Sequence, residues 1–277
     1  DFSGTSQCSI NAPSAASSST CGRPTTRAFR TLPSFPMVAS ITTLPCTRAI
    51  LAMAHSLRLS VIDREARSCE RCGSTVRLRA IVHLLTTELF GHSITLPELP
   101  MRKDIAGLGL SDAPCYSHDL ARSFAYLNTF FDRKPRLDIA EVDPGRAAEY
   151  DFIISSDVFE HVAPPVVQAF RNARRLLKRR GFLILTVPFT LDFDTVEHFP
   201  ALHDYRIEKT DGGWLLENRT VDGEREVFTD LVLHDGAGST LEMRRFALAA
   251  LERELTAAGF SRLRVAREAF PAHGIYW

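Results

Sequence analysis

The sequence predicts an α/β fold: a Rossmann-like, open and mostly parallel sheet with helices on both faces and an antiparallel part towards the C-terminus. Residues 150–156 and 182–187 are continuous apolar runs, which are typical of strands covered on both faces, and an apolar helical stripe lies between them. A strand, a helix and a second strand with short links form a βαβ unit. The two strands of such a unit are parallel.

The elements before this unit are predicted from apolar spacing and from turn residues. Four apolar residues share one face of a helix over 77–90, which a glycine ends. Residues 93–99 and 104–112 have the composition of short strands. A second helix is expected over 116–127, and a brief strand over 135–139.

The helix of the βαβ unit and the elements after it have clear boundary signals. Pro164 and Pro165 open that helix, and Gly181 suits a left-handed cap at its end. The remaining predictions are a hairpin of residues 213–218 with 226–233, a helix that starts at a capping box over 239–242 and ends at Gly259, and a strand over 261–268.

The net charge of the chain is zero because a basic segment, residues 1–60, offsets the acidic surplus of residues 61–277. The 277 residues include 33 Lys and Arg and 33 Asp and Glu, but residues 1–60 hold five Arg and one acid. That segment is rich in Ser, Thr, Ala and Pro and has no apolar period, so we expect a disordered or spurious extension. Its Arg-rich, acid-poor composition alternatively fits an organelle transit peptide. Residues 61–277 then form one domain.

Bulk properties argue against several classes of protein. The chain lacks the basic surplus of a non-specific nucleic-acid binder and any apolar run of roughly 20 residues that could span a membrane. The six Cys are irregularly spaced and no signal peptide is visible, so reduced thiols and a cytoplasmic location are expected. Cys69 and Cys72 form a CxxC, which fits structural cysteines, half of a zinc site or a redox pair.

Three sequence segments resemble class I S-adenosylmethionine-dependent methyltransferases. They are YDFIISSDVFEH at 150–161, RRLLK at 174–178 with GFLILTVP at 181–188, and LTAAGF at 255–260. The stretch CERCGSTVRLR at 69–79 is similar to one that precedes the core in a subgroup of these enzymes. The resemblance implies S-adenosylmethionine as cofactor and a small-molecule or glycan acceptor.

The glycine-rich cofactor loop of that family is altered in this chain. The family places this loop after its first strand, whereas the only G-x-G before residue 150 is Gly107-Leu-Gly109. By its spacing from residue 151 it falls at the end of the second strand, where the family usually has an acid that binds the ribose. The cofactor-binding residues that the resemblance implies are Gly107, Gly109, Asp112, Asp138, Ser155 and Ser156.

His161 is the candidate catalytic residue. It follows the strand over 150–156, at the edge where open α/β sheets bind ligands. Methyl transfer requires an aligned acceptor, and a hydroxyl acceptor is helped by a nearby base such as His. A purely structural histidine is the alternative. His198, His203 and His234 have acidic neighbours but fit no common helix face, so no metal site is expected.

The sequence therefore favours an S-adenosylmethionine-dependent methyltransferase. The alternative is a non-catalytic α/β binding module of methyltransferase-like fold that has lost the cofactor loop. A nicotinamide oxidoreductase is disfavoured, because no G-x-G-x-x-G opens the first unit. Binding of S-adenosylmethionine distinguishes the first two.

Overall fold

The structure is a computed structural model of the chain. By its internal contacts the chain divides into two units, Asp1–Leu44 and Pro45–Trp277, and all described residues lie in the second. The described residues are 48–52, 54–55, 69, 72–211, 213–234 and 240–275.

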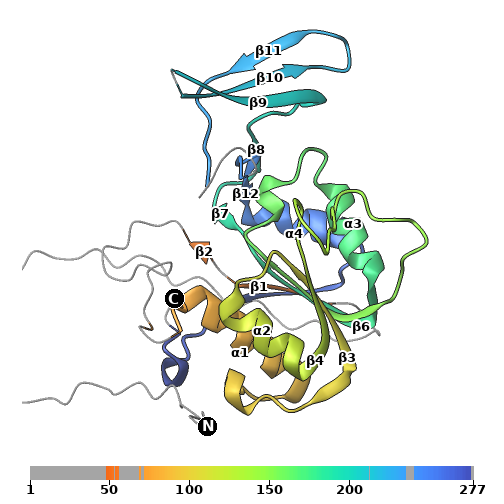
Figure 1. Ribbon diagram of the computed structural model, residues 1–277, viewed down its shortest axis with the longest axis vertical. Coiled ribbons are helices and arrows are strands. Elements are labelled where there is room, and N and C mark those ends of the chain that lie inside the picture. Colours follow the sequence, from red (N-terminus) through yellow and green to blue (C-terminus); the bar gives the residue numbers. More distant parts are fainter. Residues whose placement is uncertain are drawn as a thin grey trace, which may run out of the picture. The chain divides into compact units, whose positions relative to one another are not determined.

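A six-stranded sheet forms the centre of the second unit, and all of its strand pairings are parallel (Figure 1). This confirms the predicted open, mostly parallel sheet. The strands lie in the order β13 (Arg262–Ala266), β1 (Arg48–Ala52), β6 (Leu177–Thr186), β5 (Tyr150–Ser156), β3 (Arg102–Leu110) and β4 (Phe124–Thr129).

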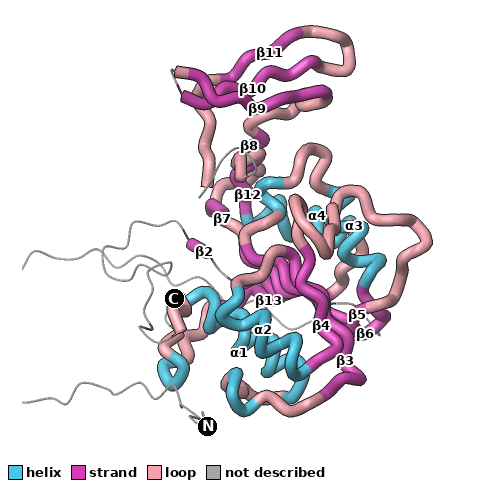
Figure 2. The backbone as a smooth tube through the Cα atoms, viewed as in Figure 1, coloured by secondary structure: helices cyan, strands magenta, loops and turns pink. Residues whose placement is uncertain are grey.

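Helices cover both faces of this sheet, as predicted (Figure 2). Alternate residues of β5 point to opposite faces: Phe152 and Ile154 pack with α1 (Val76–Phe90) and α2 (Pro114–Ser123). Ile153 packs on the other face with α3 (Val167–Leu176) and α4 (Leu248–Ala257). Each fully buried large apolar side chain contributes about 1.5–3 kcal/mol, so these two clusters hold the layers together.

The last third of the chain supplies the antiparallel part. Its hairpin turns at Gly223, whose φ of 84° lies in the left-handed region that glycine tolerates. A three-stranded antiparallel sheet consists of β9 (Asp204–Thr210), β10 (Gly213–Arg219) and β11 (Arg225–Phe228). A four-stranded sheet consists of β2 (Ala54–His55), β7 (Pro188–Thr190), β12 (Arg244–Ala247) and β8 (Val196–Glu197).

Three short 3₁₀ helices complete the described elements: η1 (Leu96–Glu98), η2 (Phe159–His161) and η3 (Pro271–His273). In the described part of the chain, no helix is long and apolar enough to span a membrane.

Several predicted elements are wrong, each for a local reason. The strand expected over 93–99 is instead a loop with η1, since Pro97 cannot donate a ladder hydrogen bond. The helix expected over 116–127 ends at Ser123, because Phe124 starts a strand that pairs with β3. Over 135–139 a single bridge between Phe130 and Arg136 replaces a strand.

Two predicted helix boundaries also differ. Gly181 does not cap α3: it lies inside β6, where a Cβ would come within 2.9 Å of the main-chain oxygen of Tyr150. Glycine is therefore needed for the close approach of β6 to β5. The capping box over 239–242 starts no helix, since α4 begins at Leu248 after a strand.

The N-terminal boundary of the sheet lies earlier than the composition suggested. Arg48–Ala52 form β1, which pairs with β6 and β13, although the expected extension ran to residue 60. Residues 1–47, 53 and 56–60 lie outside the described residues, so the expectation for them stays a prediction.

Candidate active site

The direction in which successive strands are added to the sheet reverses at β3. The chain passes from β3 outward to β4, then returns to β5 on the other side of β3 and continues to β6. Such a reversal leaves room beside the carboxyl ends of the two central strands, where open α/β sheets bind ligands. Ser111 and Asp112 follow β3 at this edge, and Asp157 follows β5.

The structure corrects the placement of the G-x-G segment. Gly107 and Gly109 lie within β3, which pairs directly with β5, so β3 is a central strand and not the outer, second one. A Cβ on Gly107 would overlap the ring of Phe152, and one on Gly109 would overlap the hydroxyl of Tyr126. Packing of the protein's own side chains therefore accounts for both glycines.

A cavity of about 410 Å³ opens at the carboxyl ends of β3 and β4 and at the start of α2. Of the predicted cofactor-binding residues, Asp112 lines it, whereas the other five do not. The lining residues are Ser111, Asp112, Ala113, Pro114, Ser117, His118, Ala121, Asn128, Phe130, Asp132 and Arg133. The cavity combines apolar walls with a few polar groups, which is typical of small-molecule sites.

Asp112 is buried in a hydrogen-bond network beside this cavity. Only 3% of the residue is exposed, and its carboxylate accepts hydrogen bonds from the hydroxyls of Tyr116, at 2.7 Å, and Tyr126. The side chain of Asn128 both accepts from and donates to the Asp112 main chain, each at 2.9 Å. Burial raises the pKa of Asp112 to about 7, against the two tyrosine hydrogen bonds, which lower it.

The carboxyl end of β5 has a second polar network. Arg77, from the first turn of α1, donates to Ser156 and forms an ion pair with Asp157 at 3.1 Å. The hydroxyl of Thr186, the last residue of β6, donates to the Asp157 carboxylate at 2.8 Å. Asp157 has a φ of 52°, so the backbone turns sharply where the strand ends. Ser155 is fully buried, and its hydroxyl has no hydrogen-bond partner within the described ranges.

These contacts show what the CERCGSTVRLR stretch does in the fold. Arg77 joins α1 to the end of β5, as described above. Arg79 donates to the main-chain oxygens of His273 at 2.9 Å and Gly274 at 2.8 Å, and so fixes the segment around η3. The thiol of Cys72 donates to the hydroxyl of Ser74 at 3.2 Å. The two arginines therefore connect this stretch to the end of β5 and to the C-terminal segment around η3.

Asp138 lies in the loop that follows β4, and its contacts are local. Its carboxylate accepts a hydrogen bond from the main-chain N–H of Ala140 at 2.9 Å. This is the usual turn geometry of an Asp side chain. The structure does not bring Asp138 to the cavity beside Asp112.

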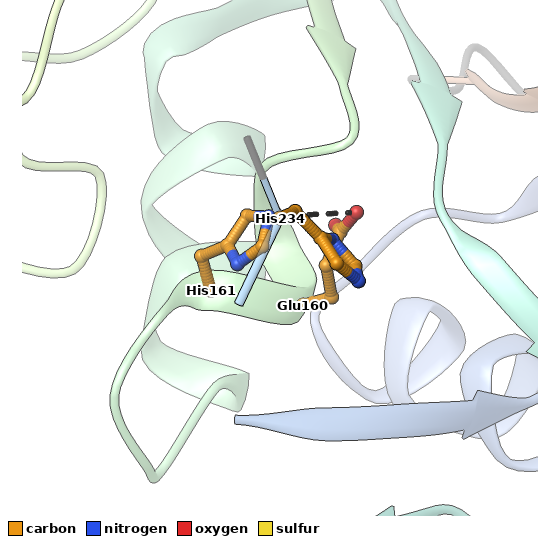
Figure 3. Close-up of side chains that lie close together, drawn as sticks. All are labelled: Glu160, His161 and His234. Atoms are coloured by element: carbon orange, nitrogen blue, oxygen red, sulfur yellow. Dashed lines mark ion pairs between the residues drawn. The ribbon is translucent and has the colours of Figure 1, made fainter. Parts of the chain in front are cut away.

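His161 ends η2 and is held by residues that follow much later in the chain (Figure 3). Its Nδ1 lies 2.9 Å from the main-chain oxygen of Leu241, and its ring meets that of His234 edge to face, with centroids 5.1 Å apart. Its Nε2 lies 3.9 Å from the Glu160 carboxylate. Burial lowers the pKa of His161, so the ring is neutral at pH 7.

Arg244, at the start of β12, fixes the main chain of η2. Its Nη1 donates to the main-chain oxygens of Phe159 at 2.8 Å and Val162 at 2.6 Å. The guanidinium is fully buried and also pairs with Glu197 at 2.6 Å. Sequence reasoning missed this residue, since nothing near Arg244 in the sequence indicates that it reaches η2.

The three histidines of the last third are only partly brought together. His198 and His234 lie on either side of Glu242, at 2.9 Å and 3.2 Å from its two carboxylate oxygens. His203 is exposed and takes no part in this arrangement. The segment 235–239 lies outside the described residues.

Comparison with known proteins identifies the central part of this fold. Residues 111–185, which run from the end of β3 to the end of β6, match the family model described as "Methyltransferase domain". This segment is similar to methyltransferase domains. The matched segment includes the residues that line the cavity beside Asp112, and it also includes Asp157 and His161. The comparison with curated proteins gives no match.

Solved structures similar to this chain share little sequence with it. A 1,6-didemethyltoxoflavin-N1-methyltransferase of Burkholderia thailandensis is 14% identical, with a TM-score of 0.34 over 65% of this chain and 64% of that one. An S-adenosylmethionine-dependent methyltransferase of Mesorhizobium loti is 17% identical, with a TM-score of 0.27 over 56% and 63%. A protein of Pyrococcus horikoshii OT3 is 10% identical, with a TM-score of 0.34 over 64% and 80%. This chain covers less than two thirds of the first two.

Proposed function

We propose that the protein is an S-adenosylmethionine-dependent methyltransferase that transfers a methyl group to a small-molecule or glycan acceptor. The observation that supports this best is the position of the cavity: it lies at the carboxyl ends of two adjacent parallel strands, within the segment that matches the methyltransferase family. Bound there, the cofactor would supply a methyl group on a positively charged sulfur.

The residues that line the cavity fit such a cofactor. The exposed carboxylate of Asp132 and the amide of Asn128 can hydrogen-bond the hydroxyls of a ribose, while Phe130 and Pro114 offer apolar surface to a base. The first turn of α2 opens onto the same space, and a helix N-terminus favours a carboxylate. Asp112 has a different role, because its carboxylate accepts from two tyrosines and thereby fixes the loop after β3.

His161 is the proposed catalytic residue on the acceptor side. It comes from the same carboxyl edge of the sheet, and its Nδ1 must carry the proton that binds the Leu241 carbonyl oxygen. Its Nε2 is then an acceptor, which can orient a hydroxyl group and take its proton. Cofactor contacts of Asp138, Ser155 and Ser156, and a cytoplasmic location, stay predictions.

Calorimetric titration of the purified protein with S-adenosylmethionine tests the proposal. Wild-type protein is expected to bind, and Asp132→Asn, a nearly isosteric change of an exposed side chain, is expected to bind at least several-fold more weakly. An absence of heat and of any thermal shift at millimolar cofactor would leave the non-catalytic binding module as the correct interpretation.

A screen of acceptors with labelled methyl donor then tests His161. We expect His161→Ala to impair turnover severely while the cofactor affinity stays close to wild type, and His203→Ala, which changes an exposed histidine of the same region, to leave both unchanged. Normal turnover in His161→Ala would remove this residue from the site.

A further inference from the structure

Three side chains that are capable of binding a metal ion meet beside η2. Glu160 and His161 are neighbours on this short helix, and His234 comes from the segment after β11 (Figure 3). One ligand atom from each residue lies within 4.8 Å of the other two. The fold thus assembles a set that the sequence does not reveal, since His234 is remote from the other two along the chain.

Glu160 is a carboxylate without a hydrogen-bond partner in the part of the chain that the structure describes. Its side chain is fully buried, and neither of its oxygens accepts a hydrogen bond there. The nearest polar partner is Nε2 of His161, at 3.9 Å, which is beyond hydrogen-bond distance. A buried carboxylate is costly unless it is paired or coordinates a cation.

Each of the two histidines has an oxygen beside one ring nitrogen, which leaves the other ring nitrogen able to bind a metal ion. Nδ1 of His161 lies 2.9 Å from a carbonyl oxygen and must donate its proton there, so Nε2 has a free lone pair. Nε2 of His234 lies 3.2 Å from the Glu242 carboxylate, and when it donates there Nδ1 has the free lone pair. Metal-binding histidines usually have such an oxygen behind the ring, which fixes the tautomer.

We infer that Glu160, His161 and His234 bind a divalent transition-metal ion of the zinc class. Two imidazoles and one carboxylate suit zinc, whereas magnesium and calcium prefer oxygen ligands. A tetrahedral zinc site separates neighbouring ligand atoms by roughly 3.4 Å. The 3.9 Å between His161 and Glu160 therefore closes with a small movement of the side chains. Three protein ligands leave a coordination position open.

The open position gives the ion a role in the proposed function. With the ion bound, Nε2 of His161 is a ligand and no longer a proton acceptor, so His161 acts on the acceptor through the ion. Zinc lowers the pKa of a bound water to about 7, and it would lower the pKa of a bound acceptor hydroxyl in the same direction. This role rests on the proposed methyltransferase activity, whereas the binding of the ion does not.

Titration of the metal-free protein with zinc chloride, followed by calorimetry, tests the site. We expect one ion to bind per chain at this site and the melting temperature to rise. Glu160→Gln, His161→Ala and His234→Ala should each weaken binding at least tenfold, while His203→Ala should not. Glu160→Gln keeps the size and shape of the buried side chain, so this variant should still fold and keep the test informative.

The absorption spectrum of the protein loaded with cobalt tests whether the ion binds at the cysteines instead. Nitrogen and oxygen ligands give visible d–d bands only, whereas thiolates add intense near-ultraviolet bands, and Cys72→Ser should leave the spectrum unchanged. Unchanged zinc affinity in all three ligand variants, or thiolate bands that disappear in Cys72→Ser, would overturn the inference. These measurements need neither cofactor nor acceptor, so their failure leaves the methyltransferase proposal intact.

Discussion

The hydroxyl of Tyr116 donates a hydrogen bond of 2.7 Å to the carboxylate of Asp112. The donor lies in the first turn of α2 and the acceptor in the loop that precedes this helix, so the bond fixes the loop at the mouth of the cavity. The carboxylate is nevertheless buried, and desolvation outweighs the hydrogen bonds that it accepts. Its protonation is therefore linked to the stability of this part of the fold.

We expect stability to fall between pH 4 and pH 7 because of Asp112. The pKa is about 7 in the folded protein and 3.8 in the unfolded reference, so the folded state holds the proton over this range and the unfolded state does not. The free energy of unfolding therefore has its full value below pH 4. It decreases as the pH rises towards 7, by roughly 4 kcal/mol at most. Urea unfolding at several pH values measures it.

Asp112→Asn should remove this pH-dependent component. Asp132→Asn alters an exposed carboxylate of the same cavity and should keep the wild-type pH profile. An identical profile in wild type and Asp112→Asn would show that another group carries the dependence.

Arg244→Met is expected to lower the free energy of unfolding by about 3 kcal/mol. The change leaves the main-chain oxygens of Phe159 and Val162 and the Glu197 carboxylate without their buried donor. Chemical denaturation measures the loss. Arg253→Met provides the control, because the pair of Arg253 with Asp194 is exposed and contributes less than about 1 kcal/mol. Equal losses in the two variants would contradict the structural role of Arg244.

Gly107→Ala should destabilise the protein by about 3 kcal/mol or more, because the added Cβ overlaps the ring of Phe152 in a close-packed core. Phe152→Leu should relieve the overlap, so the double variant should be more stable than the sum of the single changes predicts. Thermal unfolding of all three variants measures this coupling.

Gly91→Ala provides the control. The new Cβ has open space around it and the backbone has a φ of 80°, so a loss of only about 1 kcal/mol is expected. If the stability changes of Gly107→Ala and Phe152→Leu simply add up in the double variant, the added Cβ does not overlap the Phe152 ring.

The elements that the sequence predicted correctly have strong local signals. The run over 150–156 is apolar at nearly every position because both faces of β5 are covered, and α1 ends at Gly91 because that residue adopts a left-handed conformation. Phe124 shows where local signals fail. It continues the helical spacing from Leu120, yet pairing with β3 draws it into a strand.

The candidate site was less predictable, since its geometry depends on long-range contacts. His161 and Asp112 were identified from their positions near the ends of predicted strands, but their partners were not. Tyr126 reaches Asp112 from the adjacent strand, and Leu241 reaches His161 from beyond the antiparallel sheet. These contacts cannot be predicted from the spacing of residues in the sequence unless the order of the strands in the sheet is known. The misplacement of Gly107 and Gly109 had the same cause.

The contacts around η2 bear on how such an enzyme could acquire new acceptors. Three residues of one later segment form hydrogen bonds with η2. The carbonyl oxygen of Leu241 bonds the His161 ring, and the N–H of Met243 donates to the Glu160 carbonyl oxygen. Arg244 donates to the main chain at Phe159. The segment between β7 and α4 thus holds His161 in place through these contacts. Its exchange for the corresponding segment of another protein would remove that support, so a change of acceptor made in this way would also move the proposed catalytic histidine.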